Sequence, residues 1–497
     1  MLEIVNWINN YIWSPALIYL CLGTGLFFTL ATRFLQIRHM KDIGKLMFQR
    51  NTSEAGISSF QALSLALSGR VGTGNIAGVA TAIAYGGPGA VFWMWLIAFL
   101  GAGSAFVEAA LGQVWKEKQD GQFRGGPAYY IEKGLKIKWY AVLFAAVTVL
   151  ATGALLPGVQ ANSIASGMDN AFGISPWITG SVIVAVLAVI IFGGVKRIAR
   201  VAEFVVPFMA VGYILVALII IFMNISQLPD IMALIFSSAF GQDAAFGGIL
   251  GAAIAWGVKR GIYSNEAGQG TAPHAAAAAE VSHPAKQGIV QAFSVYIDTL
   301  FICSATAFMI LITGMYNVTP ENGEPIKTTL GEMKPGPGYT QAAIEAEIPG
   351  FGAPFVALAL LFFAFTTIMA YYYMAETNLA YINKKTKRVW TEYVLKFVIL
   401  GMVLYGSVKT ADVAWGLGDI GVGAMAWLNI IAILLLTKPA LKILKDYETQ
   451  KKAGKDPVFD PVKVGIENAD FWEKEYQYDG GHEPTKGTTT GQTINKN

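Results

Sequence analysis

The stretch from Gly69 to Gly78, GRVGTGNIAG, interrupts a long apolar segment that otherwise suits a membrane-spanning helix. Each interior glycine costs a helix roughly 0.5–1 kcal/mol relative to alanine. A broken backbone at membrane depth is tolerated only where it is buried in protein or lines a wet cavity. Secondary transporters build binding sites from such breaks. A helix that packs closely through small residues is the alternative, and this stretch alone favours neither interpretation.

The composition is that of a helical membrane protein. Of the 497 residues, 54% are hydrophobic and 14% are charged, and the mean hydropathy is +0.49, whereas a soluble globular protein carries about 25% charged residues. Because apolar runs of about 20 residues recur along most of the chain, we expect an all-α polytopic protein of the inner (plasma) membrane, embedded in the lipid bilayer. The net charge of +3 is too small to indicate a nucleic-acid partner.

Eleven spanning segments are expected, and the charged loops between them indicate their orientation. The segments are 14–31, 60–85, 88–112, 138–165, 175–193, 200–223, 244–275, 286–314, 350–382, 391–409 and 413–437. The loop 33–50 is strongly basic, whereas the loop 315–349 is acidic on balance. Since Lys and Arg concentrate in cytoplasmic loops, the N-terminus is predicted to lie outside and the C-terminus in the cytoplasm. The polar chain after Lys455 is expected to be disordered.

A second interruption, SNEAGQGTAP at 264–273, lies in the seventh segment, five segments after the first. Breaks at corresponding positions of two halves indicate a transporter built from an inverted repeat. The expected divisions are a first helix with its basic loop (1–59), a first five-helix repeat (60–225), a second five-helix repeat (242–440) and a polar cytoplasmic tail (441–497).

The backbone groups released at two such breaks suit a zwitterion. Free N–H groups at the start of a helix bind a carboxylate. Released carbonyl groups bind a small cation or an ammonium group. An amino acid carries both charges close together, so the paired breaks favour a small amino acid as the substrate.

The sequence around the breaks resembles a known family. The motifs are VGTGNIAGVATAI followed by GGPGAVFWMW, SNEAGQGTAP, and QGIVQAFSVYIDT followed by CSATA. Together they resemble the alanine/glycine:cation symporters of bacteria and archaea over roughly residues 14–440. The resemblance implies a leucine-transporter-type fold with an additional first helix and a 5+5 inverted repeat in which helices 2 and 7 are discontinuous. It also implies a transporter and not an enzyme, which imports alanine or glycine with Na⁺, or less often H⁺, and needs no organic cofactor.

The resemblance assigns candidate site residues to both breaks. At the first break, the residues expected to contact substrate and sodium are Gly72, Thr73, Gly74 and Asn75. At the second break and on a neighbouring helix, the expected substrate contacts are Glu266, Gly268, Gln269, Thr271 and Gln160. The sodium ligands are expected among Thr73, Asn75, Asp298, Thr366 and Thr367, whose oxygen atoms suit a hard cation.

Three positions depart from the pattern of the family. The family is expected to have Trp before the two tyrosines of the ninth segment and Gly after them, but this chain has Tyr371 and Met374. The second break often continues with Met, where this chain has Gln269. These positions border the expected pocket, so Tyr371 joins the substrate contacts. Another neutral amino acid, such as glutamine, is therefore the alternative substrate.

Several polar residues also have a purely structural interpretation. Asn75 is able to cap a helix, and Gln160 is able to bridge two helices. Asp298 suits either sodium coordination or a structural hydrogen bond. Glu108 and Glu376 are expected near the ends of their helices, where exposure at the membrane interface is favoured over a gating ion pair.

Two cations, Lys259 and Arg260, fall inside the seventh segment. Charges at this depth are costly unless they face water or a partner. Either the segment ends near Val258, or the two cations line a wet path. Glu266 has two equally favoured interpretations. It forms a buried ion pair with Lys259 or Arg260, or it contacts the ammonium group of a substrate.

Two other classes of function are less consistent with the sequence. An ion channel needs a continuous pore, usually formed by several subunits, whereas this chain has two non-equivalent breaks. An intramembrane enzyme or a primary pump lacks support because HExxH, GxSxG and GxxxxGK[ST] are absent. The four histidines show no metal-ligand spacing. A monomer is the expected form.

Overall fold

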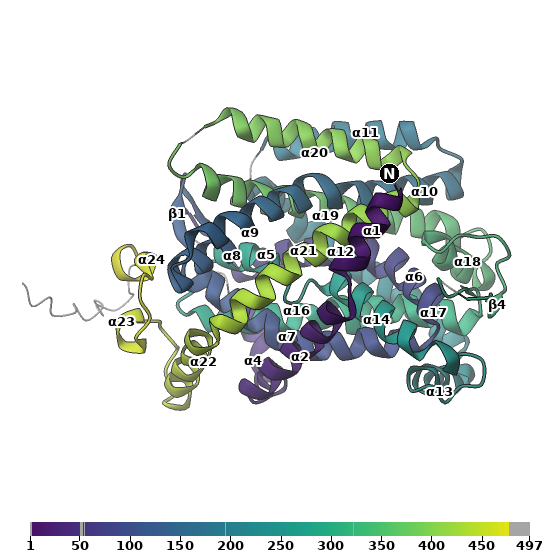
Figure 1. Ribbon diagram of the computed structural model, residues 1–497, viewed down its shortest axis with the longest axis horizontal. Coiled ribbons are helices and arrows are strands. Elements are labelled where there is room, and N and C mark those ends of the chain that lie inside the picture. Colours follow the sequence, from purple (N-terminus) through teal and green to yellow (C-terminus); the bar gives the residue numbers. More distant parts are fainter. Residues whose placement is uncertain are drawn as a thin grey trace, which may run out of the picture.

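The protein is a bundle of long helices, seen in a computed structural model that describes residues 2–49, 53, 55–193, 195–321, 323–386 and 388–476. The helices run roughly along the long axis of the bundle (Figure 1). Within these residues the strands form two small antiparallel pairs. The first pair is β1 (Glu117–Gln119) with β2 (Gln122–Arg124), and the second is β3 (Asn317–Val318) with β4 (Lys327–Thr328).

The α-helices of the first half are α1 (Leu2–Ile12), α2 (Pro15–Ala31), α3 (Leu35–Arg38), α4 (Met40–Met47), α5 (Ser59–Arg70), α6 (Val79–Gly86), α7 (Gly89–Val114), α8 (Pro127–Tyr130), α9 (Lys138–Leu150), α10 (Leu156–Phe172), α11 (Pro176–Ile191) and α12 (Val195–Met223). Those of the second half are α13 (Leu228–Ala239), α14 (Leu250–Asn265), α15 (Ala272–Ala278), α16 (Pro284–Tyr296), α17 (Ser304–Thr313), α18 (Pro337–Glu347), α19 (Gly352–Asn383), α20 (Trp390–Val408), α21 (Ala411–Leu435), α22 (Thr437–Lys452), α23 (Pro461–Val464) and α24 (Asp470–Lys474). The π-helical turns are η1 (Gly74–Gly78), η2 (Ile131–Leu135), η3 (Ala151–Leu155) and η6 (Ile297–Cys303), and the 3₁₀ turns are η4 (Ile225–Gln227) and η5 (Gly247–Ile249).

The helices confirm a polytopic membrane protein. In the described part of the chain, seven helices are long and apolar enough to cross a membrane, or eight if α1 and α2, which meet at 43°, form one span. Their limits lie close to the predicted segments; α7 and α19, for example, begin and end within two residues of prediction. Large apolar side chains such as Phe204 and Phe208 are 73% and 76% exposed, as expected of a surface that faces lipid.

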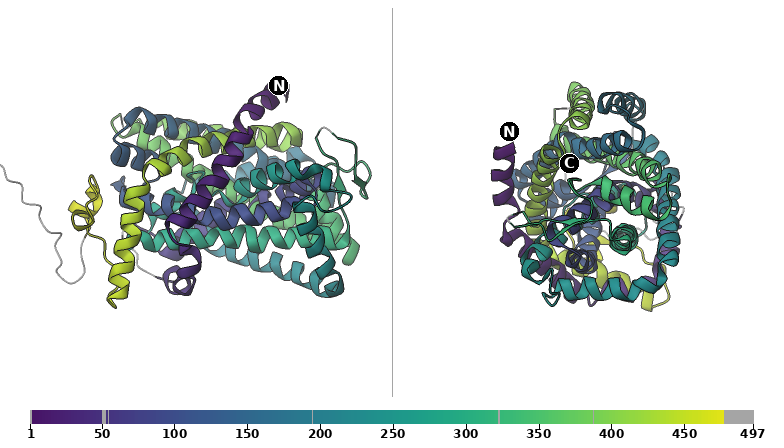
Figure 2. Two further views of the ribbon diagram at one scale, coloured as in Figure 1. Left: turned by 60° about the horizontal axis from the view of Figure 1, so that its bottom comes forward. Right: turned by 90° about the vertical axis from the view of Figure 1, so that its right-hand side faces the viewer.

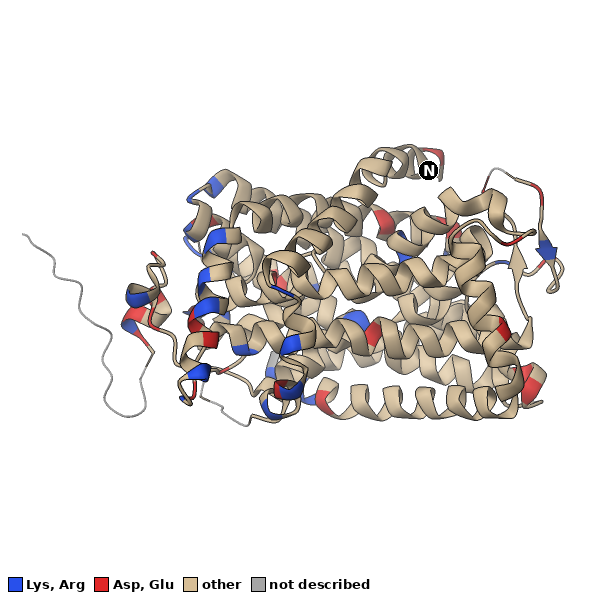
Figure 3. Ribbon diagram, turned by 90° about the horizontal axis from the view of Figure 1, so that it is seen from below, with Lys and Arg blue, Asp and Glu red and all other residues tan. Residues whose placement is uncertain are grey.

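Basic residues gather at one end of the bundle, the end that carries α22–α24 and is called the basic end below (Figure 3). The same helices project from this end in Figure 2. The opposite end carries α13, α18 and the loop between α17 and α18 (Figure 1). This separation of charge follows the alternation of loops predicted from the sequence.

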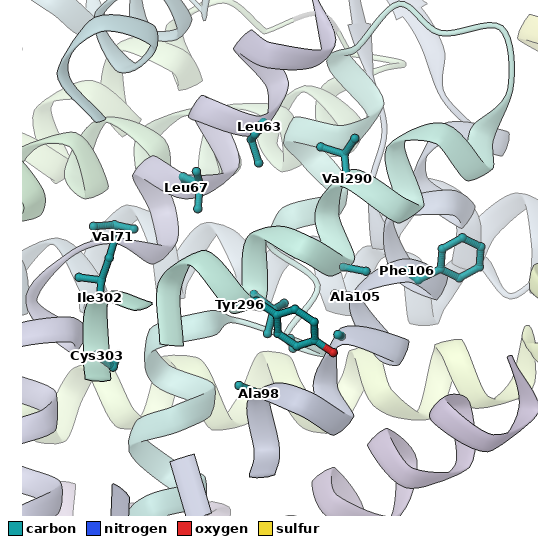
Figure 4. Close-up of a cluster of buried hydrophobic side chains, with 14 of the residues drawn as sticks. Leu63, Leu67, Val71, Ala98, Ala105, Phe106, Val290, Tyr296, Ile302 and Cys303 are labelled. Atoms are coloured by element: carbon teal, nitrogen blue, oxygen red, sulfur yellow. The ribbon is translucent and has the colours of Figure 1, made fainter. Parts of the chain in front are cut away.

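The centre of the bundle is formed by α7, which packs against α14, α15 and α16. Small residues such as Gly257, Gly261 and Gly288 permit this close contact, because a methyl group added at any of them would lie within 2.7 Å of an atom of α7. Figure 4 shows Leu63, Leu67 and Val71 of the first broken segment beside the helices that carry Val290, Tyr296 and Ile302. This packing fixes the position of the first break.

Lys259 and Arg260 lie within a continuous helix, so α14 does not end near Val258. Arg260 donates two hydrogen bonds to Asp419 of α21, each of 2.9 Å, and Lys259 Nζ lies 2.8 Å from the same carboxylate. The Arg260 side chain is 3% exposed, and its guanidinium lies 4.5 Å from the Trp415 ring centre. The two cations are therefore held by an anion and aromatic rings, and the predicted alternative of pairing with Glu266 is wrong.

The expectation that the chain after Lys455 is disordered is wrong for residues 456–476, while 477–497 lie outside the described residues. After α22 the chain folds back against the basic end, and Phe459 and Trp472 are completely buried. Trp472 Nε1 donates a hydrogen bond to the Gln113 carbonyl oxygen at 3.0 Å. Beneath it, burial lowers the pKa of Lys116 to about 7. A few apolar residues thus dock an otherwise polar segment.

Replacing Trp472 with alanine is expected to release this segment. Truncation of a buried Trp costs about 3–5 kcal/mol, so the undocked population should rise at least 100-fold. Limited trypsin digestion at Lys463 measures this change as a faster cleavage. Val462→Ala is the matched control, since Val462 is 44% exposed. Equal cleavage of Trp472→Ala and wild type would contradict the docking.

Candidate functional site

The first break lies between α5 and α6, where the backbone leaves the helix at Val71 and resumes through η1. The Gly72 amide donates to Asn75 Oδ1 at 2.8 Å, so Asn75 caps the new start, as its structural interpretation predicts. The Thr73 amide donates to Gln160 Oε1 at 3.0 Å. A methyl group at Gly72 would lie 2.4 Å from Thr367 Oγ1. The first break therefore brings together Asn75, Gln160 and Thr367, which were predicted as site residues on three different segments.

The second break lies between α14 and α15 and depends on backbone shapes with positive φ. Glu266 ends α14 with a φ of 57°, and Gly268 and Gly270 follow with φ of 80° and 86°. Such a conformation in a residue other than glycine is uncommon and often marks a functional site. The Thr271 hydroxyl donates to Glu266 Oε2 at 2.8 Å.

Glu108 of α7 supports the second break from inside the protein. Its carboxylate accepts hydrogen bonds from the amides of Gly268 (3.3 Å) and Gly270 (3.1 Å) and from Asn429 Nδ2 (2.8 Å). It is completely buried, so the prediction of interfacial exposure is wrong. The one signal of this role in the sequence is an acidic residue within an apolar run, and the run alone does not reveal the hydrogen-bond partners of Glu108.

The two breaks meet at the centre of the bundle. A methyl group added at Gly74 would lie 3.1 Å from Ser264 Cα. Beside this contact, Asp298 Oδ1 accepts from Asn75 Nδ2 at 2.6 Å and from the Ser264 hydroxyl at 3.1 Å. Asp298 Oδ2 accepts from Thr299 Oγ1 at 2.7 Å. A buried carboxylate thus joins both breaks to η6.

The predicted sodium ligands fall into two places. One is Asp298 with Asn75, described above. The other is at Thr367, whose Oγ1 lies 3.3 Å from the Val71 carbonyl oxygen and 3.0 Å from the Phe363 carbonyl oxygen. Thr366 Oγ1 donates to the same Phe363 carbonyl at 2.9 Å. Both places offer clusters of hard oxygen atoms, which suit a small cation.

Several polar atoms around the breaks are buried without a hydrogen-bond partner in the described part of the protein. They are Thr73 Oγ1, Tyr263 Oη, Glu266 Oε1, and Oε1 and Nε2 of Gln269. A buried polar group without a partner costs about 1–3 kcal/mol. Tyr371, which is 2% exposed, lies close to Gln160 and adds an aromatic wall. A small polar molecule held at the breaks would supply the missing partners.

The site is closed toward the basic end by contacts between α15 and α19. The Tyr373 hydroxyl donates to the His274 carbonyl at 3.0 Å, and Asn378 Nδ2 lies 2.7 Å from His274 Nε2. His274 has no metal-ligand role in the sequence pattern, and its structural role was not predicted. Nearer the surface, Arg124 forms a bidentate ion pair with Glu376, with both distances 2.7 Å. Glu376 is thus paired and not simply exposed at an interface, contrary to the prediction.

Toward the opposite end, the site is closed by the side chains that surround Asp419. The Tyr263 and Trp415 rings lie 5.0 Å apart, and a methyl group at Gly78 would touch Trp415. Arg260 and its ion pair with Asp419 lie on the same side. The breaks therefore lie in an enclosed site with a separate closure on each side.

Comparison with known proteins places the chain among transporters. The sequence profile of the sodium:alanine symporter family matches residues 1–461. A putative sodium/proton-dependent alanine carrier protein of Bacillus subtilis is 66% identical over 479 residues, covering 96% of this chain and 99% of the relative. The sodium/proton-dependent alanine carrier protein of Bacillus sp. strain PS3 is 57% identical, covering 87% and 97%. A probable sodium/glutamine symporter of Bacillus subtilis is 46% identical, covering 92% and 93%.

A solved structure shares the fold. The chain matches a Na⁺-coupled sialic acid symporter, seen in a substrate-bound outward-open state, with a TM-score of 0.50 over 93% of this chain and 96% of that one. At 12% identity, this likeness concerns the fold alone. The profile match over nearly the whole chain and the 66% identity to an alanine carrier show that the chain belongs to the sodium:alanine symporter family.

Proposed function

We propose that this protein is a secondary active symporter, which imports alanine or glycine together with Na⁺. The observation that carries the proposal is the meeting of two broken helices at a buried carboxylate, Asp298, beside unpaired polar atoms. Broken helices of this kind hold ions and charged substrate groups in secondary transporters. The alanine carriers among the relatives support the choice of substrate.

The membrane architecture that fits this function has eleven spans in a 5+5 inverted repeat. The eight long spans, with α1 and α2 counted as one, are joined by two broken spans, α5–α6 and α14–α15, and by the shorter α11. The repeats would occupy 60–225 and 242–440. The basic end faces the cytoplasm by the positive-inside rule, which puts the N-terminus outside.

The substrate would lie between the two breaks. Its carboxylate would approach the helix start at Gly72, Thr73, Gly74 and Asn75, where the helix dipole favours an anion. Gln160 and Tyr371 would line one side, and the second break would contribute Gly268, Gln269 and Thr271. The polar atoms of Thr73 and Gln269 that have no partner among the described residues are the first candidates for substrate contacts.

Sodium would bind at the two clusters of oxygen atoms. Asp298 is the strongest candidate ligand because it carries the charge, and Asn75 positions it. Thr367 and the Val71 carbonyl offer the second place, next to Thr366 in the same helix, and Thr73, two residues after Val71, is a further candidate. A Na⁺ ion at either place reduces the cost of the buried polar groups and thereby stabilises the closed form with its substrate.

Transport then needs the two closures to open in turn. Separation of α15 from α19 would open the site to the cytoplasm, and separation of α14 from α21 would open it to the outside. A Na⁺ ion that crosses a potential of 100 mV contributes about 2.3 kcal/mol to uptake. Because both closures shut the same site, an ion channel with a continuous pore fits less well.

Glutamine is the second candidate substrate, favoured by the glutamine symporter among the relatives and by Gln269 and Met374 at the site. Competition with labelled alanine uptake distinguishes the two substrates. Alanine as the substrate predicts that unlabelled alanine inhibits at a concentration at least tenfold lower than glutamine does. The reverse order would assign glutamine.

Replacing Thr367 with valine tests the coupling to sodium. Valine keeps the shape and removes the hydroxyl, so one sodium ligand is lost and the Na⁺ concentration for half-maximal alanine uptake is expected to rise about tenfold, or about 1.4 kcal/mol. Thr367→Ser, which keeps the hydroxyl, should retain the wild-type value. An unchanged Na⁺ dependence in Thr367→Val would remove this residue from the sodium site.

A further inference from the structure

The core of the protein holds more buried negative charge than positive charge around the breaks. Arg70, Glu108, Glu266 and Asp298 are each at most 1% exposed. If all four were ionised, one guanidinium would face three carboxylates, a net charge of −2, and the cluster of Lys259, Arg260 and Asp419 on the outer side would reduce it only to −1. Uncompensated charge at membrane depth is expensive, so bound cations must balance it.

Two of the three carboxylates accept hydrogen bonds at both of their oxygen atoms. Both oxygens of Glu108 accept hydrogen bonds, from Gly268, Gly270 and Asn429. Asp298 accepts from three side chains and is the place proposed above for Na⁺. Each of these carboxylates can therefore stay ionised at a reduced cost.

Glu266 differs from both. Its Oε2 accepts one hydrogen bond, from Thr271, while its Oε1 is buried without a partner in the described residues. Arg70 makes its hydrogen bonds elsewhere, to the Gln291 carbonyl at 3.1 Å and to the Ser294 hydroxyl, and forms no ion pair with Glu266 within the described residues. A carboxyl oxygen in this setting needs a cation or a proton of its own.

The surroundings of Glu266 select between these possibilities. A methyl group at Gly69 would lie 3.2 Å from Glu266 Oε2, 3.6 Å from Oε1 and 3.0 Å from Met374 Cε. The backbone of Gly69 therefore runs beside the carboxyl, and the Met374 methyl group lies on the same side of Gly69. A proton on Oε1 adds no heavy atom to this packed interior, whereas a metal ion or a substrate ammonium group needs room beside Oε1 for a further heavy atom.

We propose that Glu266 binds a proton that is carried inward with the amino acid and sodium. The proposal rests on the proposed symport and adds a second coupling ion with its own site. An O–H bond forms at Glu266 from a proton of the outer solution when the site is open outward. The proton leaves to water when the site opens to the cytoplasm and the carboxylate becomes hydrated. The titratable and charged groups that face Glu266 from neighbouring elements are Arg70, Glu108, Tyr263, Asp298 and Tyr371.

Proteoliposomes that contain a trapped pH-sensitive dye test the proposal. The membrane potential is clamped with K⁺ and valinomycin, and labelled alanine uptake and internal acidification are recorded together under an inward Na⁺ gradient. The quantity compared is the number of protons per alanine, which does not depend on a variant's transport rate. Wild type is expected to show a constant ratio, and Glu266→Gln a ratio at least tenfold lower.

Two variants serve as controls. Glu266→Asp keeps a carboxyl and should retain proton entry, and Glu108→Gln, equally buried but hydrogen-bonded at both oxygens, should retain the wild-type ratio. A wild-type ratio in Glu266→Gln would overturn the proposal. So would sodium-driven alanine uptake by wild type with no acidification, a result that leaves the proposed function intact. Failure of wild type to take up alanine at all would instead refute the proposed function.

Binding measurements cover the case in which Glu266→Gln does not transport. Titration calorimetry of alanine with Na⁺ at pH 8, in two buffers of different ionisation enthalpy, gives the number of protons taken up on binding. Wild type should take up protons and Glu266→Gln should not. Equal proton uptake would overturn the proposal. Complete loss of alanine binding at pH 6 and pH 8 would identify Glu266 as the ammonium ligand and also overturn it.

Discussion

Replacing Asn75 with alanine is expected to reduce sodium-driven alanine uptake about 100-fold. The variant loses the hydrogen bond to Asp298 and the bond that caps the first break at Gly72. Hydrogen bonds to charged groups contribute about 1.5–3 kcal/mol, and a 100-fold loss corresponds to about 2.7 kcal/mol. The measurement is the initial rate of labelled alanine uptake per folded transporter in proteoliposomes.

Asn162→Ala is the matched control for this prediction. Asn162 is also buried and hydrogen-bonds two carbonyls, of Gly406 and Lys409, but it lies away from both breaks. Its loss should lower thermal stability and leave the sodium dependence of uptake as in wild type. Uptake by Asn75→Ala within threefold of wild type would show that the first break is not the transport site.

Replacing Asp419 with alanine is expected to cause the largest loss of stability. The change leaves Lys259 and Arg260 buried without their counter-ion, and removal of one partner from a buried ion pair costs about 3–5 kcal/mol. Thermal unfolding in detergent, followed by tryptophan fluorescence, should show a clear fall in the midpoint. Because Asp419 also closes the site from outside, the remaining folded protein should bind alanine more weakly.

The control for this prediction lies on the same helix. Asp412 is 54% exposed and faces Lys334 at 3.6 Å, and an exposed pair contributes about 0–1 kcal/mol. Asp412→Ala should therefore unfold at nearly the wild-type temperature. If Asp419→Ala unfolded at the same temperature as Asp412→Ala, Asp419 would not be the counter-ion that stabilises the buried Lys259 and Arg260.

The spans and both breaks were predictable from the sequence because their signals are local. Apolar runs of sufficient length define the long helices, and clustered glycines define the interruptions at Gly72 and Gly268. Asn75 and Gln160 were predicted as substrate or sodium contacts, with helix capping and helix bridging as the structural alternatives. The structure shows both residues hydrogen-bonded to the backbone of the first break, and their binding roles stay predictions.

The partners of the buried charges were not predictable, because they are distant in the chain. Arg260 and Asp419 are 159 residues apart, and Glu108 and Asn429 are 321 apart. Nothing in either neighbourhood identifies the other member of the pair. The prediction of disorder after Lys455 was wrong for another reason. The segment is polar overall, and its composition does not reveal that a few aromatic residues, such as Trp472, anchor it.

The most direct test of sodium-coupled symport is labelled alanine accumulation by wild-type protein in proteoliposomes, with and without an imposed inward Na⁺ gradient. With symport, alanine is concentrated above its external level only while the gradient lasts, and collapse of the gradient releases it. Equilibration of alanine to the external level regardless of Na⁺ would contradict symport, as would the absence of uptake for alanine, glycine and glutamine alike.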